Sequence, residues 1–306
     1  FTAINAKEKN PELEITILEK GKEVLQKVKI SGGGRCNVTH ACFEPKELVK
    51  FYPRGEKELL GPFHQFMTGD TFEWFNDRGV PLKIENDNRV FPEANTSQAI
   101  IDCFQHAVHK LGIKVFTNCG VRSVCQQRNK WIINTKEQVF EADKLVIAAG
   151  SSKKVWELCQ RLDHTIIPPV PSLFTFNIKD PRITDLLGIS VPNATVSIVG
   201  TKLEASGPLL ITHWGMSGPA VLKLSAFGAR ILADKDYQYN VVVNWLSRST
   251  NKILNVLLNL KKKEPRKTVV LKSPFSEISK RLWERFVLFS EIRTHQNWAD
   301  LNNHQL

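Results

Sequence analysis

Three consecutive glycines, Gly32 to Gly34, lie in the run from Ile30 to Asn37 and constrain the backbone more than any other feature of this chain. Such a run disfavours regular helix and strand, because glycine loses more backbone entropy on folding than any other residue. Glycine also adopts left-handed φ values, which allow successive N–H groups to converge on an anion. Arg35 follows with a planar donor group suited to phosphate or to an electron-rich ring oxygen. The spacing alone leaves two possibilities open, a flexible turn and a constrained anion-binding turn.

A helix, a turn and a strand precede the glycine run. Residues 1–9 are predicted to be helical up to Pro11, and residues 14–20 form a short apolar run typical of a buried strand. This order is the second half of a βαβ unit, and because the chain starts with Phe1 rather than Met we expect its natural N-terminus to be missing. Glu19 at the strand end is placed to accept hydrogen bonds from a ribose diol, but it also suits an ordinary charged strand end.

The pattern downstream predicts a mixed α/β domain. Helices are expected over residues 46–51, 63–78 and 97–111, and extended segments over residues 80–92, 113–116, 121–126, 131–135 and 138–141. Residues 144–150 are almost entirely apolar and end in Ala148, Ala149 and Gly150, which predicts a fully buried strand. Together these elements indicate a doubly wound sheet with an antiparallel excursion.

Three prolines, Pro168, Pro169 and Pro171, indicate a domain boundary, because proline is excluded from helix interiors and central strands. We therefore expect a first domain over residues 1–165 and a second over residues 166–306. The second is predicted to be β-rich, with strands over residues 174–178, 194–199, 208–212 and 238–245. A helix over residues 220–233 and a largely helical tail from Asn251 complete it.

A second unusual cluster spans Thr212 to Pro219. His213 is a candidate acid or base near neutral pH, and Ser217 is placed to cap the helix that follows. Gly215 and Gly218 permit a close approach to that helix N-terminus, a natural anion site. The structural alternative is a capped helix entry with a tryptophan in the core. No Gly-x-Ser-x-Gly motif accompanies the cluster, so a hydrolase is not expected.

The amino-acid composition restricts the class of protein to which this chain can belong. The chain is 42% hydrophobic and 24% charged, as in ordinary globular proteins, and has neither a membrane-spanning apolar run nor a secretory signal, so we expect it in the cytoplasm. Its net charge of +11 is interpreted as a solvated basic surface or as attraction for phosphate-bearing ligands, rather than as a nucleic-acid footprint.

The cysteines and histidines do not predict a metal site. The six cysteines form no Cys-x-x-Cys pair, and His106 and His109 have no second pair of ligands. Arg35 next to Cys36 favours a reactive thiolate, but only Cys42 is close in sequence as a partner. We therefore expect Cys36 to be a packed or ligand-contacting thiol.

Four ordered blocks resemble a known family. The segment Lys27 to Thr39 resembles the signature of aminoacetone-oxidase-like FAD-binding flavoproteins, bacterial enzymes with a two-dinucleotide-binding-domain relationship. Residues 89–92, 171–174 and 210–219 are similar to later blocks of that family, in the same order. The likeness extends over essentially the whole chain.

The resemblance implies a Rossmann-like FAD-binding α/β domain into which a β-barrel-like domain and a helical segment are inserted. Glu19 would bind the adenosine ribose, Val121 would present its backbone to adenine, and Ser31 to Asn37 would lie along the cofactor towards the flavin ring. The cofactor-binding residues it implies are Glu19, Lys20, Ser31, Gly32, Gly33, Gly34, Arg35, Cys36, Asn37, Val121, Ala148, Ala149 and Gly150. The family's first Gly-rich turn would precede Phe1, and its closing FAD segment would follow Leu306. Compared with the family, we therefore expect this chain to lack both ends. Ser151 and Ser152 stand where a second glycine is common, in a shortened loop.

The implied activity is that of an FAD-dependent oxidoreductase. Electrons or a hydride would pass between a small-molecule substrate and the flavin, with NAD(P)H as co-substrate or oxygen as the other partner. His213 is the only candidate acid or base, and the sequence names neither a substrate class nor an oligomeric state. The alternatives are a non-catalytic or RNA-associated flavoprotein, whose affinity for RNA would fall steeply with salt, and a remnant unable to hold cofactor.

Overall fold

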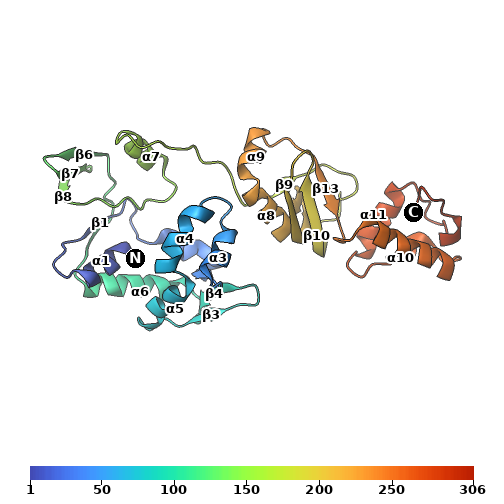
Figure 1. Ribbon diagram of the computed structural model, residues 1–306, viewed down its shortest axis with the longest axis horizontal. Helices are drawn as coiled ribbons and strands as arrows, with labels where there is room; N and C mark the ends of the chain where they lie inside the picture. Colours follow the sequence, from blue (N-terminus) through green and yellow to red (C-terminus); the bar gives the residue numbers. More distant parts are fainter. The chain divides into compact units, whose positions relative to one another are not determined.

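The computed structural model describes residues 1–306, which form two compact units, Phe1–Ile167 and Pro168–Leu306 (Figure 1). The division falls at the start of the proline run, in a segment without regular secondary structure. The assignment of the first unit to cofactor binding and of the second to an inserted domain stays a prediction.

The first unit mixes short helices and short strands. Its helices are α1 (Thr2–Lys9), α2 (Gln26–Gly34), α3 (Pro45–Leu48), α4 (Glu56–Gln65), α5 (Thr68–Asn76), α6 (Ser97–Lys110) and α7 (Lys153–Gln160), with a 3-10 turn over Val49–Phe51. Its strands are β1 (Thr16–Leu18), β2 (Thr39–His40), β3 (Leu82–Ile84), β4 (Arg89–Pro92), β5 (Lys114–Phe116), β6 (Ser123–Gln127), β7 (Lys130–Asn134) and β8 (Val139–Ala142). The predicted helices over residues 1–9 and 97–111 are confirmed, as are the strands that correspond to β5, β6, β7 and β8.

The strands of the first unit form three small sheets. Strands β1 and β5 are parallel, with Thr16 opposite Lys114 and Leu18 opposite Phe116. The antiparallel orders β2-β4-β3 and β6-β7-β8 make the other two sheets. The predicted doubly wound sheet is therefore present only as one parallel pair, whereas the predicted antiparallel excursion is the β6-β7-β8 sheet.

One predicted strand is wrong. Residues 144–150 form no strand, and the side chains of Val146 and Ile147 are 67% and 43% exposed. A strand needs neighbouring backbone to satisfy its N–H and C=O groups, and no strand pairs with this segment. For the same reason β1, with one partner only, is half-buried instead of fully buried.

The core of the first unit is built around α6. Its apolar face buries Ile100, Cys103 and Ala107, and Ile4 of α1 lies in the same core. Helix α1 lies beside α6 (Figure 1). The side-chain oxygen of Thr96 accepts a hydrogen bond from the backbone N–H of Gln98 at 3.3 Å, which caps the helix.

The second unit contains one antiparallel sheet and four helices. Its strands are β9 (Phe176–Asn177), β10 (Ser190–Ile198), β11 (Glu204–Thr212), β12 (Gly215–Ser217) and β13 (Val241–Asn244), in the order β13-β10-β11-β12-β9. Its helices are α8 (Pro219–Phe227), α9 (Ala229–Asp234), α10 (Thr250–Lys263) and α11 (Lys280–Phe289), with 3-10 turns over Val269–Leu271 and Trp298–Asp300. The predicted β-rich second region with a helical tail is confirmed, and a barrel-like closure stays a prediction.

The sheet of the second unit buries one face under α8 (Figure 1). Val196 and Ile198 on β10 lie in the same core as Val221 and Leu224 on α8, and Leu282 on α11 extends this core. The predicted helix over residues 220–233 is split into α8 and α9 at Gly228. The alternation of buried and exposed residues along β10 is the period-2 pattern of a sheet with one covered face.

Candidate functional site

The glycine run forms a turn that is closed by a hydrogen bond. The helical part of α2 ends before Ser31, whose ψ of 151° is extended, and Gly32 and Gly33 follow with φ of 55° and 68°. The backbone N–H of Cys36 donates to the carbonyl of Ser31 at 3.0 Å, and the Ser31 hydroxyl donates to the carbonyl of Val28 at 2.8 Å. Of the two possibilities left by the sequence, these bonds favour the constrained turn.

The three glycines have different surroundings. A Cβ atom on Gly32 would lie 2.6 Å from the backbone nitrogen of Asn37 and 3.0 Å from Cε1 of Phe91. A Cβ atom on Gly33 or Gly34 would meet nothing within 4 Å, although both residues have positive φ. Gly32 is therefore required for close packing, whereas Gly33 and Gly34 leave their backbone accessible to a ligand.

The β3-β4 hairpin holds the turn from one side. Nη1 of Arg35 lies 2.6 Å from Oε1 of Glu85, and the Arg35 guanidinium lies 3.9 Å from the centroid of the Phe91 ring. Oδ1 of Asn37 accepts a hydrogen bond from the backbone N–H of Val90 at 3.2 Å. The Arg35 side chain thus has a carboxylate partner already, which makes it first a structural group. Glu85 lies 50 residues away in sequence, and no sequence signal had linked the two.

Cys36, in the same turn, is buried in the core of the first unit. Its φ of 61° is left-handed, which is uncommon for a residue other than glycine. This burial agrees with the expected packed thiol.

A second group of predicted residues gathers at the carboxyl end of the β1-β5 pair. The N–H of Glu19 donates to the carbonyl of Phe116, and the N–H of Cys119 donates to the carbonyl of Glu19, both at 2.8 Å. Lys20 packs on Gly120, where an added Cβ would lie 3.2 Å from Lys20 Cγ. Because parallel strands end at the same sheet edge, Glu19 and Lys20 lie beside the segment that leads into Val121.

The Glu19 carboxylate retains hydrogen-bonding capacity. Its Oε1 accepts a hydrogen bond from the backbone N–H of Gly21 at 2.5 Å, and this is the only hydrogen bond made by the side chain. The half-buried carboxylate can therefore accept further donors, such as ribose hydroxyls.

The structure does not bring the remaining predicted residues into either group. Ala148, Ala149 and Gly150 are exposed and lie outside the sheets. His213 belongs to the second unit, where it is exposed on the turn between β11 and β12. Trp214 beside it is 73% exposed, so the alternative of a tryptophan in the core is wrong.

The predicted cap at Ser217 is also wrong. Ser217 is part of β12, where it pairs with Leu210, and the N-cap position of α8 is occupied by Gly218. Since glycine has no side chain, α8 begins without a side-chain cap. A Cβ on Gly215 would overlap backbone atoms of Phe176 and Ile178, so this glycine allows β12 to pack beside β9. Tertiary packing accounts for this glycine without an anion.

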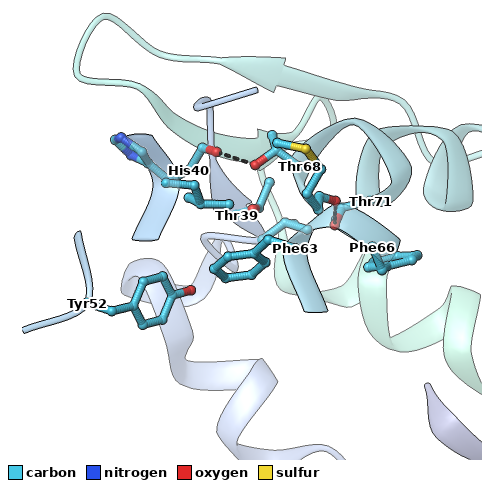
Figure 2. Close-up of a pocket in the computed structure, with 10 residues that line it drawn as sticks. Thr39, His40, Tyr52, Phe63, Phe66, Thr68 and Thr71 are labelled. Atoms are coloured by element: carbon cyan, nitrogen blue, oxygen red, sulfur yellow. Dashed lines mark hydrogen bonds between the residues drawn. The ribbon is translucent and has the colours of Figure 1, made fainter. Parts of the chain in front are cut away.

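A hollow of about 220 Å³ lies directly after the glycine turn (Figure 2). Val38 and Thr39 continue the chain from Asn37 into its wall, and residues from η1 to α5 complete it. The lining residues are Val38, Thr39, His40, Leu48, Tyr52, Phe63, Phe66, Met67, Thr68 and Thr71. The sequence analysis did not single these residues out, because they share no motif and come together only through the packing of α4 and α5.

Two further features of the structure concern membrane-spanning helices and groups of metal-binding side chains. No helix among residues 1–306 is long and apolar enough to cross a membrane. No three His, Cys, Asp or Glu side chains are grouped so that they could hold a metal ion.

Three characterised relatives are about one quarter identical to the chain over the aligned residues. It is 24% identical over 233 residues to the 3-dehydro-bile acid delta(4,6)-reductase of Clostridium scindens, covering 73% of the chain and 56% of the relative. It is 26% identical over 224 residues to the ribosomal RNA dihydrouridine synthase of Escherichia coli, covering 70% and 54%. For the Haemophilus influenzae synthase of the same name, the identity is 25% over 227 residues, covering 70% and 55%. The chain thus spans little more than half the length of these relatives.

Solved structures give only weak similarity. An L-amino acid deaminase from Proteus vulgaris has a TM-score of 0.30 at 14% identity, covering 66% of this chain and 51% of that one. The enzyme from Proteus myxofaciens has a TM-score of 0.31 at 14% identity, covering 86% and 73%. Scores this low support no inference about fold or function.

The family model of the HI0933-like protein Rossmann domain matches residues 1–274. The match includes both the glycine turn and the β1-β5 edge. The narrower likeness to aminoacetone-oxidase-like proteins stays an expectation. The extent of the match shows that this chain belongs to the HI0933-like Rossmann-domain family.

Proposed function

We propose that this chain binds FAD and acts as part of a flavin-dependent oxidoreductase. The observation that carries the proposal is the constrained turn from Ser31 to Asn37, whose Gly33 and Gly34 backbone is left-handed and open to a ligand. Membership of the HI0933-like family and the redox names of two kinds of relatives support it.

The residues present fit FAD at two places. At the β1-β5 edge, the Glu19 carboxylate has free acceptor capacity for a ribose diol, with Lys20 and the backbone of Val121 beside it. At the glycine turn, Gly33 and Gly34 are exposed and have open space beside their Cα atoms, so a polar cofactor edge can approach their backbone. Bound FAD would supply the ring that accepts or donates a hydride, while the chain binds and orients it.

The residues around the turn hold it in one conformation before any ligand binds. Gly32 packs on Phe91, Asn37 binds the backbone of Val90, and Arg35 is paired with Glu85. A binding loop that is already ordered loses less conformational entropy when its ligand arrives. Ala148, Ala149 and Gly150 would add a third contact with the cofactor.

Reduction is the favoured direction of the reaction. One relative is named a reductase, and two are named for the synthesis of a dihydro product. The substrate would then accept a hydride from reduced flavin, and NAD(P)H would restore the reduced flavin. Oxygen is the other candidate partner, for an oxidase.

The absorption spectrum tests the central claim. The protein purified without added flavin should show flavin bands, or should gain them during titration with FAD. Absence of bands before and after FAD addition would rule the proposal out. If bands appear, anaerobic bleaching by NADH or NADPH identifies a reductase, and bleaching by neither points to an oxidase or to a non-catalytic flavoprotein.

A matched pair of variants locates the cofactor. Gly33→Leu and Gly79→Leu impose similar backbone strain, because the two glycines have φ of 68° and 73° and open surroundings. Only Gly33→Leu places a side chain on the turn, so only this variant should lose FAD affinity. Equal affinities in the two variants would place the cofactor elsewhere.

A second candidate substrate is a base within RNA. The net charge of +11 and the two ribosomal RNA dihydrouridine synthases among the relatives favour it. If the substrate is RNA, the logarithm of the binding constant should fall linearly with the logarithm of the salt concentration. The slope should be proportional to the number of phosphate groups that the protein contacts. A small-molecule substrate predicts a much weaker salt dependence.

A further inference from the structure

We infer that the hollow after the glycine turn, which is lined by ten residues between Val38 and Thr71, is the substrate subsite. Its ligand is an uncharged, planar system of one or two rings with a hydroxyl or carbonyl group. The inference rests on the proposed function, since the ring would be the partner of the flavin. Its position supports this role, because Thr39 lies two residues beyond Asn37, the last residue of the turn.

The lining is poor in charged groups. None of the ten lining residues is Asp, Glu, Lys or Arg, and His40 is the one lining side chain that can take up a positive charge. An ionic ligand would lose hydration in the hollow, and the lining offers no carboxylate, ammonium or guanidinium group to replace it. A ligand with phosphate or carboxylate groups is therefore disfavoured.

The walls favour a flat ring. Tyr52 and Phe63 have ring centroids 5.5 Å apart at an interplanar angle of 50°, and Phe66 lies on the other side of Phe63 (Figure 2). Aromatic side chains in this arrangement offer both ring faces and edges to a π-system. A saturated ring of equal size would fill the space but would lose these oriented contacts.

Hydroxyl groups supply the polar contacts. The Thr68 hydroxyl donates to the His40 carbonyl at 2.9 Å, and the Thr71 hydroxyl donates to the Met67 carbonyl at 2.8 Å (Figure 2). The Thr71 oxygen can still accept a hydrogen bond from a ligand, whereas the Thr68 side chain is only 1% exposed and is held in the wall of the hollow. The hydroxyls of Thr39 and Tyr52 make no hydrogen bond within the chain, so each can donate or accept. One hydroxyl or carbonyl on the ring would satisfy them.

The volume limits the size of the ring system. A cavity of about 150 Å³ holds one benzene molecule in a well-studied apolar case. A hollow of about 220 Å³ therefore accommodates one substituted ring or two fused rings. Larger ligands would have to extend out of it.

Binding of 2-naphthol to the flavin-free protein tests the inference. Ligand-observed NMR should show saturable binding of 2-naphthol, a planar two-ring alcohol. Decahydro-2-naphthol is equally large but not planar, and 2-naphthalenesulfonate is planar but charged, so both should bind at least about 10-fold more weakly. Equal binding of all three, or no binding of 2-naphthol, would overturn the inference.

Two variants place the probe in the hollow. Phe63→Leu should weaken 2-naphthol binding about 2- to 10-fold, from the loss of one aromatic contact. The control Phe43→Leu, at an aromatic residue outside the hollow, should leave it unchanged. Thr39→Val keeps the β-branched shape and should weaken binding about 5-fold through the lost hydroxyl. If Phe43→Leu weakens binding as much as Phe63→Leu, the probe binds elsewhere and the inference fails.

The outcomes separate this inference from the proposed function. Failure of FAD binding with retained 2-naphthol binding would overturn the cofactor and leave the ring site in place. FAD binding without 2-naphthol binding would overturn the ring site alone. Displacement of 2-naphthol by a short oligouridylate would overturn the inference that the ligand is uncharged, because the ring would then belong to RNA.

Discussion

At the scale of single residues, the three glycines of the turn show how identical neighbours acquire different roles. Gly32, Gly33 and Gly34 all have positive φ, but only Gly32 lies against other atoms. The sequence predicts a left-handed backbone equally well for each of the three glycines. What surrounds each glycine depends on Phe91 and Asn37, and Phe91 reaches the turn from a distant hairpin.

Gly32→Ala should destabilise the protein more than Gly33→Ala. Both variants place a side chain at positive φ, which costs about 1–2 kcal/mol. Gly32→Ala adds a clash with the Asn37 backbone and Phe91, worth about 1–3 kcal/mol more. Urea unfolding of the two variants measures the difference in the free energy of unfolding. Equal losses would mean that the close packing at Gly32 does not contribute.

Tyr239 makes stability depend on pH in the alkaline range. Burial raises the pKa of Tyr239 from 10.0 to about 12, because the ionised phenolate loses hydration in the protein. Between these values the unfolded chain gives up its proton first, so the free energy of unfolding should fall as pH rises from 10 to 12. Tyr239→Phe should reduce this fall, whereas Tyr237→Phe, at an exposed neighbour, should not. Unfolding curves at pH 9 to 12 provide the measurement, and identical slopes in all three proteins would refute the assignment.

At the scale of elements, local signals sufficed where an element completes its own hydrogen bonds. Helix α6 has an amphipathic pattern and a capping threonine, and the structure confirms both. Residues 144–150 have a strong apolar pattern, but a strand is completed only by a neighbour, and none pairs with them. The helix prediction for α6 therefore succeeded where the strand prediction for residues 144–150 failed.

Thr96→Ala should weaken α6 through loss of its cap. The Thr96 side chain accepts a hydrogen bond from the Gln98 N–H, so its removal should lower the free energy of unfolding by about 0.5–2 kcal/mol. Ser152 is the N-cap of α7 in the same unit but makes no side-chain cap hydrogen bond, so Ser152→Ala should have little effect. Chemical denaturation followed by circular dichroism compares them. A larger loss for Ser152→Ala would contradict the capping geometry.

At the scale of the whole molecule, the chain is two compact units joined through a proline-rich segment. Each unit has its own buried core, one around α6 and one around the β10-β11 pair. Two exposed segments outside regular structure flank α7, residues 144–150 and residues 163–173. These segments differ in predicted role, since only the first contains cofactor-binding candidates.

Limited proteolysis with and without FAD should distinguish the two segments. Thermolysin, which cleaves before bulky apolar residues, should first cut within both, because both expose apolar side chains such as Val146 and Ile167. Added FAD should protect residues 144–150 and leave residues 163–173 cleavable. Mass spectrometry of the early fragments identifies the cut sites. Protection of neither segment, in a protein that binds FAD, would remove Ala148 to Gly150 from the cofactor site.

The sequence by itself determined the local elements and the outline of the site. The helices over residues 1–9 and 97–111, the short antiparallel strands, the boundary at the prolines and the unusual backbone of the glycine turn follow from propensities and φ preferences of neighbouring residues. The helices predicted over residues 63–78 and 220–233 are each interrupted in the structure. Tertiary structure alone decided which residues surround that turn. The Arg35–Glu85 pair, the packing of Gly32 on Phe91 and the hollow formed with Tyr52 and Phe63 join positions far apart along the chain. Such contacts depend on how whole elements pack, and packing is a property of the three-dimensional arrangement that no local pattern contains.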